Sequence, residues 1–233
     1  MGFYPFFDSS YILVFIGIAI TLMASARVKS TFAKYSRVRS TSGLTGAQAA
    51  ERILQASGIY DVQIELVAGN LSDHYDPRHK VLRLSNTVYG QTSLAAIGVA
   101  AHECGHAIQH QNSYLPLKLR GALVPVANIG SMAAWPVIII GLFLGGSQFL
   151  IDLGIILFSV AVLFQLVTLP VEFNASSRAI ARLGETGILS GEELRQSKKV
   201  LDAAALTYVA AAAATILQLL RLILLFGGGR NRD

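Results

Sequence analysis

Long stretches without any charged side chain are the feature that most limits the folds open to this chain. No charged residue lies between Arg120 and Asp152, and residues 11–26, 153–171 and 203–218 are also uncharged. A helix needs about 20 mostly apolar residues to cross a bilayer, and irregular backbone is excluded from the hydrocarbon. Hydrophobic residues make up 53% of the 233 residues and charged residues only 14%, far from soluble averages. The sequence therefore predicts a membrane protein with about four transmembrane helices.

The segment His102-Glu103-Cys104-Gly105-His106 carries the strongest chemical motif. Ser93 can cap the start of a helix, and the Ala-rich apolar run that follows it favours continuing that helix into the motif. With 3.6 residues per turn, His102 and His106 stand on one helix face, where two imidazoles can chelate one metal ion. Glu103 lies beside that face, placed to act as general base for a zinc-activated water. Cys104, the chain's one cysteine, is predicted to pack the helix against its neighbours.

A catalytic zinc ion normally has three protein ligands, so a third ligand is required. Gln109 and Asn112 stand where a metzincin would need Gly and His, which excludes that class. His110 lies another turn along the helix, and we expect it to be out of reach of the same ion. The chain after the third span returns to the membrane face of the motif helix, and Glu172 is the first acid there. We therefore predict Glu172 as the third ligand, on a helix that Pro170 begins.

Three polar residues follow Glu172 at helical spacing, namely Asn174, Ser176 and Arg178. They could orient a ligating histidine or steady a developing oxyanion. Surface or packing roles are equally open for each of them.

The part between the first two spans predicts a small α+β structure. Thr45 and Gln48 match a capping box before a short amphipathic helix over 47–57. Residues 62–67 alternate apolar with polar side chains, as a half-buried strand does. The turn sequence beginning at Asp76-Pro77 then predicts a β-hairpin just before the motif helix.

We expect this hairpin to border the substrate cleft. Its second strand, residues 80–85, is predicted to offer a free edge along which an extended peptide adds as a further strand. Tyr75, Leu82 and Leu84 are the candidate substrate contacts, and His74 or His79 could also line the cleft.

The distribution of basic residues predicts the orientation in the membrane. Five Lys or Arg residues lie between Arg27 and Arg39, and five more between Arg178 and Lys199, whereas the turn between the second and third spans has none. The positive-inside rule therefore puts 27–120 and 172–202 in the cytoplasm and both termini outside, although Arg230 and Arg232 argue weakly against this.

The same distribution accounts for the net charge of +5. Because no nucleic-acid motif accompanies the basic residues, nucleic-acid binding is not expected. The first apolar run lacks a basic start and a small-residue cleavage site, so it is interpreted as a retained anchor and not a signal peptide.

Four segments resemble the bacterial YugP-like membrane zinc metallopeptidases: 71–77, 82–85, 99–109 and 172–176. The chain is more distantly similar to HtpX-like membrane proteases, whose Glu-x-x-Ala-Asp motif supplies the third zinc ligand. That motif maps onto Glu172 and Ala175, with Ser176 in place of its Asp. The resemblance implies a gluzincin-type endopeptidase.

The predicted molecule is a mainly α membrane protein with about four transmembrane helices and a small α+β zincin-like catalytic domain containing a short sheet. In order, its parts are an N-terminal anchor, a cytoplasmic part with the sheet and motif helix, a transmembrane hairpin, a cytoplasmic helical part with the third ligand, and a C-terminal span with its tail. Their bounds are 1–26, 27–121, 122–171, 172–202 and 203–233.

The predicted function is that of an integral-membrane zinc metalloendopeptidase with one Zn²⁺ per chain and its active site at the cytoplasmic face of the bacterial inner membrane. Its partners would be a peptide or protein substrate and the lipid bilayer, with a homo-oligomer or a regulatory membrane partner left open. The alternative is a membrane scaffold or transporter-like protein with a structural zinc, which would normally have four protein ligands.

Overall fold

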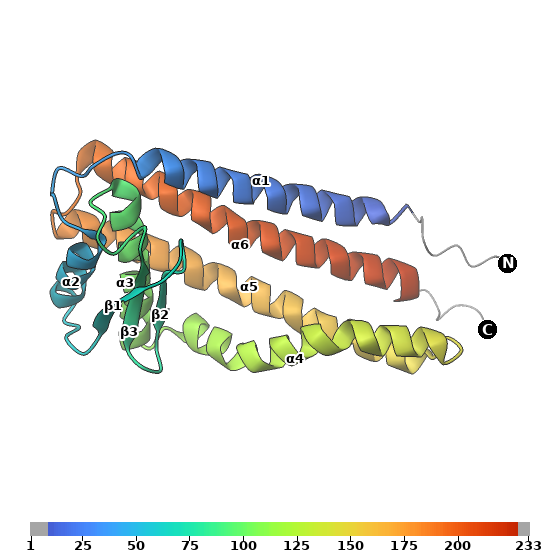
Figure 1. The fold of residues 1–233 in the computed structure, drawn as a ribbon. Coiled ribbons are helices and arrows are strands. Elements are labelled where there is room, and N and C mark those ends of the chain that lie inside the picture. The colour runs from blue at the N-terminus through green and yellow to red at the C-terminus, as the bar shows by residue number, and fades with distance from the viewer. Residues whose placement is uncertain (1–8, 228–233) are drawn as a thin grey trace. The chain divides into compact units, whose positions relative to one another are not determined.

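The computed structural model describes residues 9–227, and six helices and three strands lie in this part (Figure 1). The predicted anchor and tail extend beyond it, since residues 1–8 and 228–233, including Arg230 and Arg232, lie outside the described residues. The elements are α1 (Tyr11–Tyr35), α2 (Gly46–Ala56), β1 (Gln63–Val67), β2 (His74–Asp76), β3 (Val81–Ser85), α3 (Leu94–Gln111), α4 (Leu115–Phe143), α5 (Gln148–Glu185) and α6 (Gly191–Phe226).

Four of these helices, α1, α4, α5 and α6, are long and apolar enough to cross a membrane, as predicted. The described chain divides into two compact units. The apolar unit consists of 9–24, 119–169 and 207–227, and the α+β unit consists of 25–118 and 170–206. All four long helices, α1, α4, α5 and α6, contribute a segment to each unit. The predicted mainly α membrane protein with a small sheet is confirmed.

Within the apolar unit, α4 and α5 form the predicted hairpin. Gly145 and Gly146 make its turn with φ angles of 75° and 81°, a backbone region that favours glycine. Ala134 and Ile138 of α4 pack in one cluster with Phe158 of α5 and Leu222 of α6.

The prediction that Pro170 begins a new helix is wrong, because Pro170 lies inside the continuous helix α5. A proline removes one backbone donor, but membrane helices tolerate this where neighbouring groups satisfy the freed carbonyl. The apolar run before Pro170 and the helix-forming residues after it both favour helix, so α5 extends past the uncharged run to Glu185.

The α+β unit is built around α3. Ser93 caps its first turn by accepting a hydrogen bond from the backbone N–H of Ala96, as predicted. The capping box of Thr45 and Gln48 is also present at the start of α2. Helices α2 and α3 pack on each other, and α3 also contacts β2 and β3 (Figure 1).

The sheet has the order β1-β3-β2, with β1 parallel and β2 antiparallel to β3. The predicted hairpin of β2 and β3 is confirmed. The expectation that residues 80–85 offer a free edge is wrong, because β3 is hydrogen-bonded on both sides. The edge strands on its two sides are β1 and β2.

Candidate metal centre

Three potential metal ligands converge between α3 and the part of α5 in the α+β unit. The Glu172 Oε2 atom lies 3.2 Å from His102 Nε2 and 3.7 Å from His106 Nε2. Three ligands about 2.1 Å from one tetrahedral zinc ion stand about 3.4 Å apart, so these spacings fit a shared ion. The triad is also well enclosed, since only 14%, 11% and 2% of the side chains of His102, His106 and Glu172 are exposed. Two imidazoles and one carboxylate are a donor set typical of catalytic zinc.

A close helix crossing brings Glu172 to the histidines. A Cβ atom on Gly105 would lie 2.4 Å from the carbonyl oxygen of Ala175, so the backbones of α3 and α5 meet at this point. Ala175 is fully buried. Because Glu172 lies about one turn before Ala175, this crossing turns its carboxylate toward the motif face of α3.

The electrostatics of the site favour positive charge. Burial alone would lower the pKa of His106, but its hydrogen bond to Glu172 and the negative charges of Glu103 and Glu172 raise that pKa above its ordinary value. Carboxylates that stabilise a proton on an imidazole also stabilise a divalent cation beside it. The influence of Glu103 on His106 further means that Glu103, which is only 8% exposed, lies within electrostatic reach of the triad.

The buried side chain of Gln109 decides which nitrogen of His106 carries the proton in the neutral ring. The Gln109 Nε2 group donates to the carbonyl oxygen of Val171 at 2.8 Å and to Asn174 Oδ1 at 3.0 Å. Its Oε1 atom, which can only accept, therefore faces His106 Nδ1 at 3.1 Å. His106 must donate from Nδ1, so in the neutral ring Nε2 carries the free lone pair that a metal ion requires.

The residues predicted to follow the third ligand divide into two roles. The Ser176 Oγ atom lies 3.1 Å from His102 Nδ1, so Ser176 contacts the ligating histidine His102 directly. Asn174 accepts from Gln109 and also from Arg178 Nε at 2.7 Å. Asn174 and Arg178 thus reach His106 only through Gln109.

The residues predicted to contact substrate, Leu82, Leu84 and Tyr75, lie outside the metal triad. Leu82 and Leu84 are fully buried in the core cluster under the sheet, where an extended peptide cannot touch them. Tyr75 on β2 hydrogen-bonds through its hydroxyl to His110 Nδ1 at 2.8 Å, one helical turn after His106. Burial of the Tyr75 ring, with the carboxylates of Asp61 and Asp76 nearby, raises the pKa of Tyr75 to about 12.

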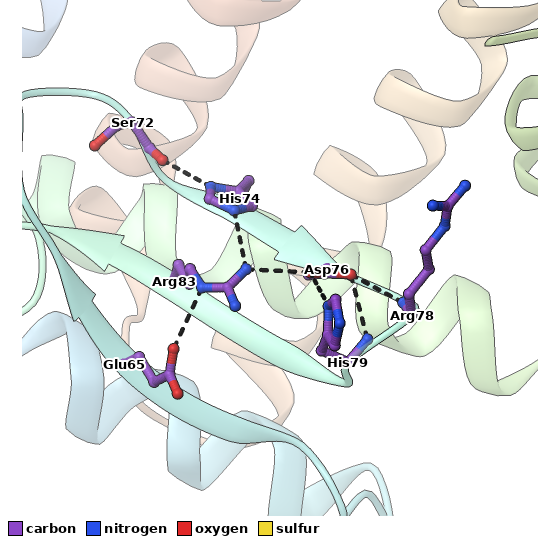
Figure 2. A network of polar contacts seen from close by, with 7 residues as sticks. All are labelled: Glu65, Ser72, His74, Asp76, Arg78, His79 and Arg83. Carbon is purple, nitrogen blue, oxygen red and sulfur yellow. Dashed lines mark hydrogen bonds and ion pairs between the residues drawn. The ribbon is translucent and has the colours of Figure 1, made fainter. Parts of the chain in front are cut away.

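The two histidines of the hairpin, His74 and His79, belong to a network on the surface of the sheet (Figure 2). Arg83 is its centre, at 3.1 Å from Asp76 Oδ2 and 3.3 Å from Glu65 Oε2. His79 Nδ1 lies 2.7 Å from Asp76 Oδ2, and His74 Nε2 lies 3.5 Å from Arg83. His74 and His79 are therefore held by surface partners and not by the metal triad.

Two residues of the site were missed from the sequence. Gln109 entered only as a departure from the metzincin pattern, and Gly105 was not assigned any role. The position of Gln109, three residues after His106 on the same face, was an available signal for a contact between the two side chains. Cys104 is buried in the core and its Sγ atom lies 3.6 Å from the carbonyl oxygen of Ala50, a packing position.

Comparison with known proteins points to a family of zinc peptidases. The model of a family described as "Putative neutral zinc metallopeptidase" matches residues 10–227. The chain is 51% identical over 221 residues to the "Putative membrane protease YugP" of Bacillus subtilis (strain 168), an alignment that covers 95% of this chain and 98% of that protein. No solved structure matches the chain. With four helices able to span a membrane, the chain is a multi-pass membrane protein and belongs to the YugP-like family of "putative neutral zinc metallopeptidases".

Proposed function

We propose that this protein is a zinc endopeptidase of the membrane, in which His102, His106 and Glu172 hold one zinc ion and Glu103 transfers protons. The observation that carries the proposal is the convergence of two histidine Nε2 atoms on one buried carboxylate, with both Nδ1 atoms engaged by other side chains. Such engagement on the far side of a ring is typical of metal-ligating histidines. Family membership supports the same chemistry.

The roles of the side chains follow from their chemistry. A zinc ion supplies Lewis acidity, which acidifies a water molecule and polarises the carbonyl group of a peptide bond. Glu103 accepts the proton of the attacking water and passes it to the leaving amine. Gln109 and Ser176 keep the two imidazole rings oriented, so the donor atoms need little rearrangement.

We further propose that the outer edge of β2 receives the substrate as an added strand. Two observations support this edge: β2 is at the end of the strand order, and its Tyr75 contacts α3 one turn from His106. Main-chain hydrogen bonds along an edge hold an extended peptide with little dependence on its side chains. Binding of an uncleaved peptide to the Glu103→Gln variant should slow hydrogen exchange of β2 amides, and unchanged exchange there would rule this edge out.

The orientation with the metal triad in the cytoplasm remains part of the proposal. Its support is the contrast between the basic segments of the α+β unit and the uncharged α4–α5 turn. In intact cells, a membrane-impermeant maleimide should label Ser147→Cys in that turn and spare Arg78→Cys in the hairpin. The reverse pattern would place the triad outside.

A structural zinc site is the competing interpretation. Structural sites are usually closed by four protein ligands, and the described residues bring three donors together, with Glu103 as an acid beside them. That arrangement favours catalysis.

The decisive experiment compares Glu103→Gln with wild type in purified full-length protein. We expect the variant to keep its zinc and to cleave an unfolded protein at least ~100-fold more slowly, because a general base contributes about 10²–10⁴-fold. Glu51→Gln, at an exposed position of α2, is the matched control and should behave as wild type. Retained cleavage by Glu103→Gln with zinc still bound would refute the mechanism.

A further inference from the structure

A small basic cleft lies between the C-terminal part of α1 and the N-terminal part of α6, within the α+β unit. Its volume is about 230 Å³, and its polar lining consists of Arg27, Thr31, Lys34, Tyr35, Lys199 and Asp202. Tyr35 of α1 and Val200 of α6 belong to one buried cluster, so the two helices pack against each other next to the cleft. Residues that are about 170 positions apart in the sequence thus form one concave surface.

The cleft carries excess positive charge. Its one acid, Asp202, has both carboxylate oxygens engaged by Lys198, at 2.8 Å and 2.7 Å. Arg27, Lys34 and Lys199 make no ion pair with any other residue between 9 and 227. Three cations therefore line one cavity without an ion-pair partner in the described part of the chain. Lys34 lies over the ring of Tyr35, and Lys199 is within electrostatic range of Glu192. Thr31 and Tyr35 add hydroxyl groups that can donate hydrogen bonds.

The position of the cleft along its two helices points to the membrane surface. Arg27 directly follows the uncharged run 11–26 of α1, and Lys199 and Asp202 directly precede the uncharged run 203–220 of α6. A helix that passes from an apolar run into charged residues crosses from hydrocarbon into the headgroup layer at that point. Both helices that line the cleft, α1 and α6, change between apolar and charged residues at the cavity.

We propose that the cleft binds the phosphate group of an anionic phospholipid headgroup. Basic pockets between membrane helices at the level of the headgroups bind such lipids, because charge-assisted hydrogen bonds to phosphate add to the attraction of the anionic surface. Lys29 and Arg37 belong to the same stretch of chain but do not line the cavity, so general juxtamembrane charge does not account for the grouping. The proposal is independent of the peptidase chemistry.

The test measures retained lipid by native mass spectrometry of full-length protein equilibrated with equal amounts of phosphatidylglycerol and phosphatidylcholine. Wild type should retain phosphatidylglycerol preferentially. A triple variant, Arg27→Gln with Lys34→Gln and Lys199→Gln, should lose on the order of 100-fold in this preference, from about 1 kcal/mol per basic residue near a membrane surface. The matched control replaces Lys29, Arg37 and Arg52, which are exposed and lie outside the cleft, with Gln and should keep the preference.

An unchanged preference in the cleft variant, or an equal loss in the control, would overturn the proposal. Excess inorganic phosphate should leave the bound lipid in place. Displacement of the lipid by phosphate from wild type would instead assign the cleft to the free ion. If the triple variant does not fold, Lys199→Gln alone carries the test, with an expected loss of about 5-fold.

Discussion

The α+β unit contains two polar networks of similar hydrogen-bond length in opposite surroundings. Behind the metal triad, Gln109 joins His106 to Asn174, and Gln109 is fully buried. On the hairpin, Asp76 joins His79 to Arg83, and 71% of the His79 side chain and 28% of the Arg83 side chain are exposed (Figure 2). The contacts alone do not distinguish them, since the distances lie between 2.7 Å and 3.1 Å in both.

Burial gives the two networks different consequences. A buried group that loses its partner has no water to replace it, at a cost of about 1–3 kcal/mol, and the buried network therefore tolerates one arrangement. Water and salt substitute for a lost partner at the surface. We infer that the buried network sets the geometry of the metal site and that the hairpin network only supports the edge strand.

The largest effect is expected from removing the carboxylate of Glu172, which lies next to His106 in the metal triad. Glu172→Ala leaves two histidine donors. We expect zinc affinity to fall by more than about 100-fold, because removing even a residue that only hydrogen-bonds to a metal ligand can cost that much affinity. Cleavage should be lost with the metal. Glu185→Ala, at an exposed position later in α5, is the control for loss of a carboxylate from this helix. Zinc content equal to wild type in Glu172→Ala would remove Glu172 from the site.

A smaller effect is expected at the helix crossing. Gly105→Ala places a Cβ atom 2.4 Å from the Ala175 carbonyl oxygen, so the helices must separate. We expect the free energy of unfolding to fall by up to about 3 kcal/mol, with weaker zinc binding as Glu172 moves away. Gly121→Ala, where an added Cβ meets no atom within 4 Å, should be tolerated. Denaturation and zinc titration of both variants measure the difference.

The next effect tests the buried network itself. Gln109→Leu keeps the volume but removes the acceptor for His106 Nδ1 and the donor to Asn174. We expect zinc affinity to fall about 10- to 100-fold. Gln111→Leu, an exposed position two residues later on the same helix, should leave it unchanged. If both variants bind zinc alike in a competition titration, the orienting role of Gln109 is wrong.

The smallest effect is expected on the hairpin and depends on pH. The hydrogen bond from His79, with Arg83 close by, lowers the pKa of Asp76 below its ordinary value. Asp76 therefore stabilises the hairpin above its unfolded pKa of about 3.9, and this contribution is lost as the pH falls through the lower folded value.

Asp76→Asn should speed hydrogen exchange of residues 74–85 at neutral pH, and the difference from wild type should shrink in strong acid or high salt. Zinc affinity at neutral pH should not change. A fall as large as that of Gln109→Leu would erase the distinction between the two networks.

Much of this molecule follows from local sequence periods. The uncharged runs predict four membrane helices because a bilayer leaves few alternatives, and the spacing of His102 and His106 places them on one face in any helix. The proximity of Glu172 was also predictable, because a hairpin of two spans returns the chain to its starting face. The capping box at Thr45 and the β-hairpin are equally local and were found as predicted.

Other features depended on how the elements meet. The strand order put β2 at the edge and buried Leu82 and Leu84 of β3. The alternation of apolar and polar residues did not predict this, because it does not show that β1 pairs with β3. Gln109 acquired its role only because the helix crossing brings the Val171 carbonyl, 62 residues away, within 2.8 Å of its amide. The sequence by itself determined which donors share a face, because helical period is local. Tertiary packing decided which atoms of those donors face one another, because that depends on the approach of two backbones at Gly105.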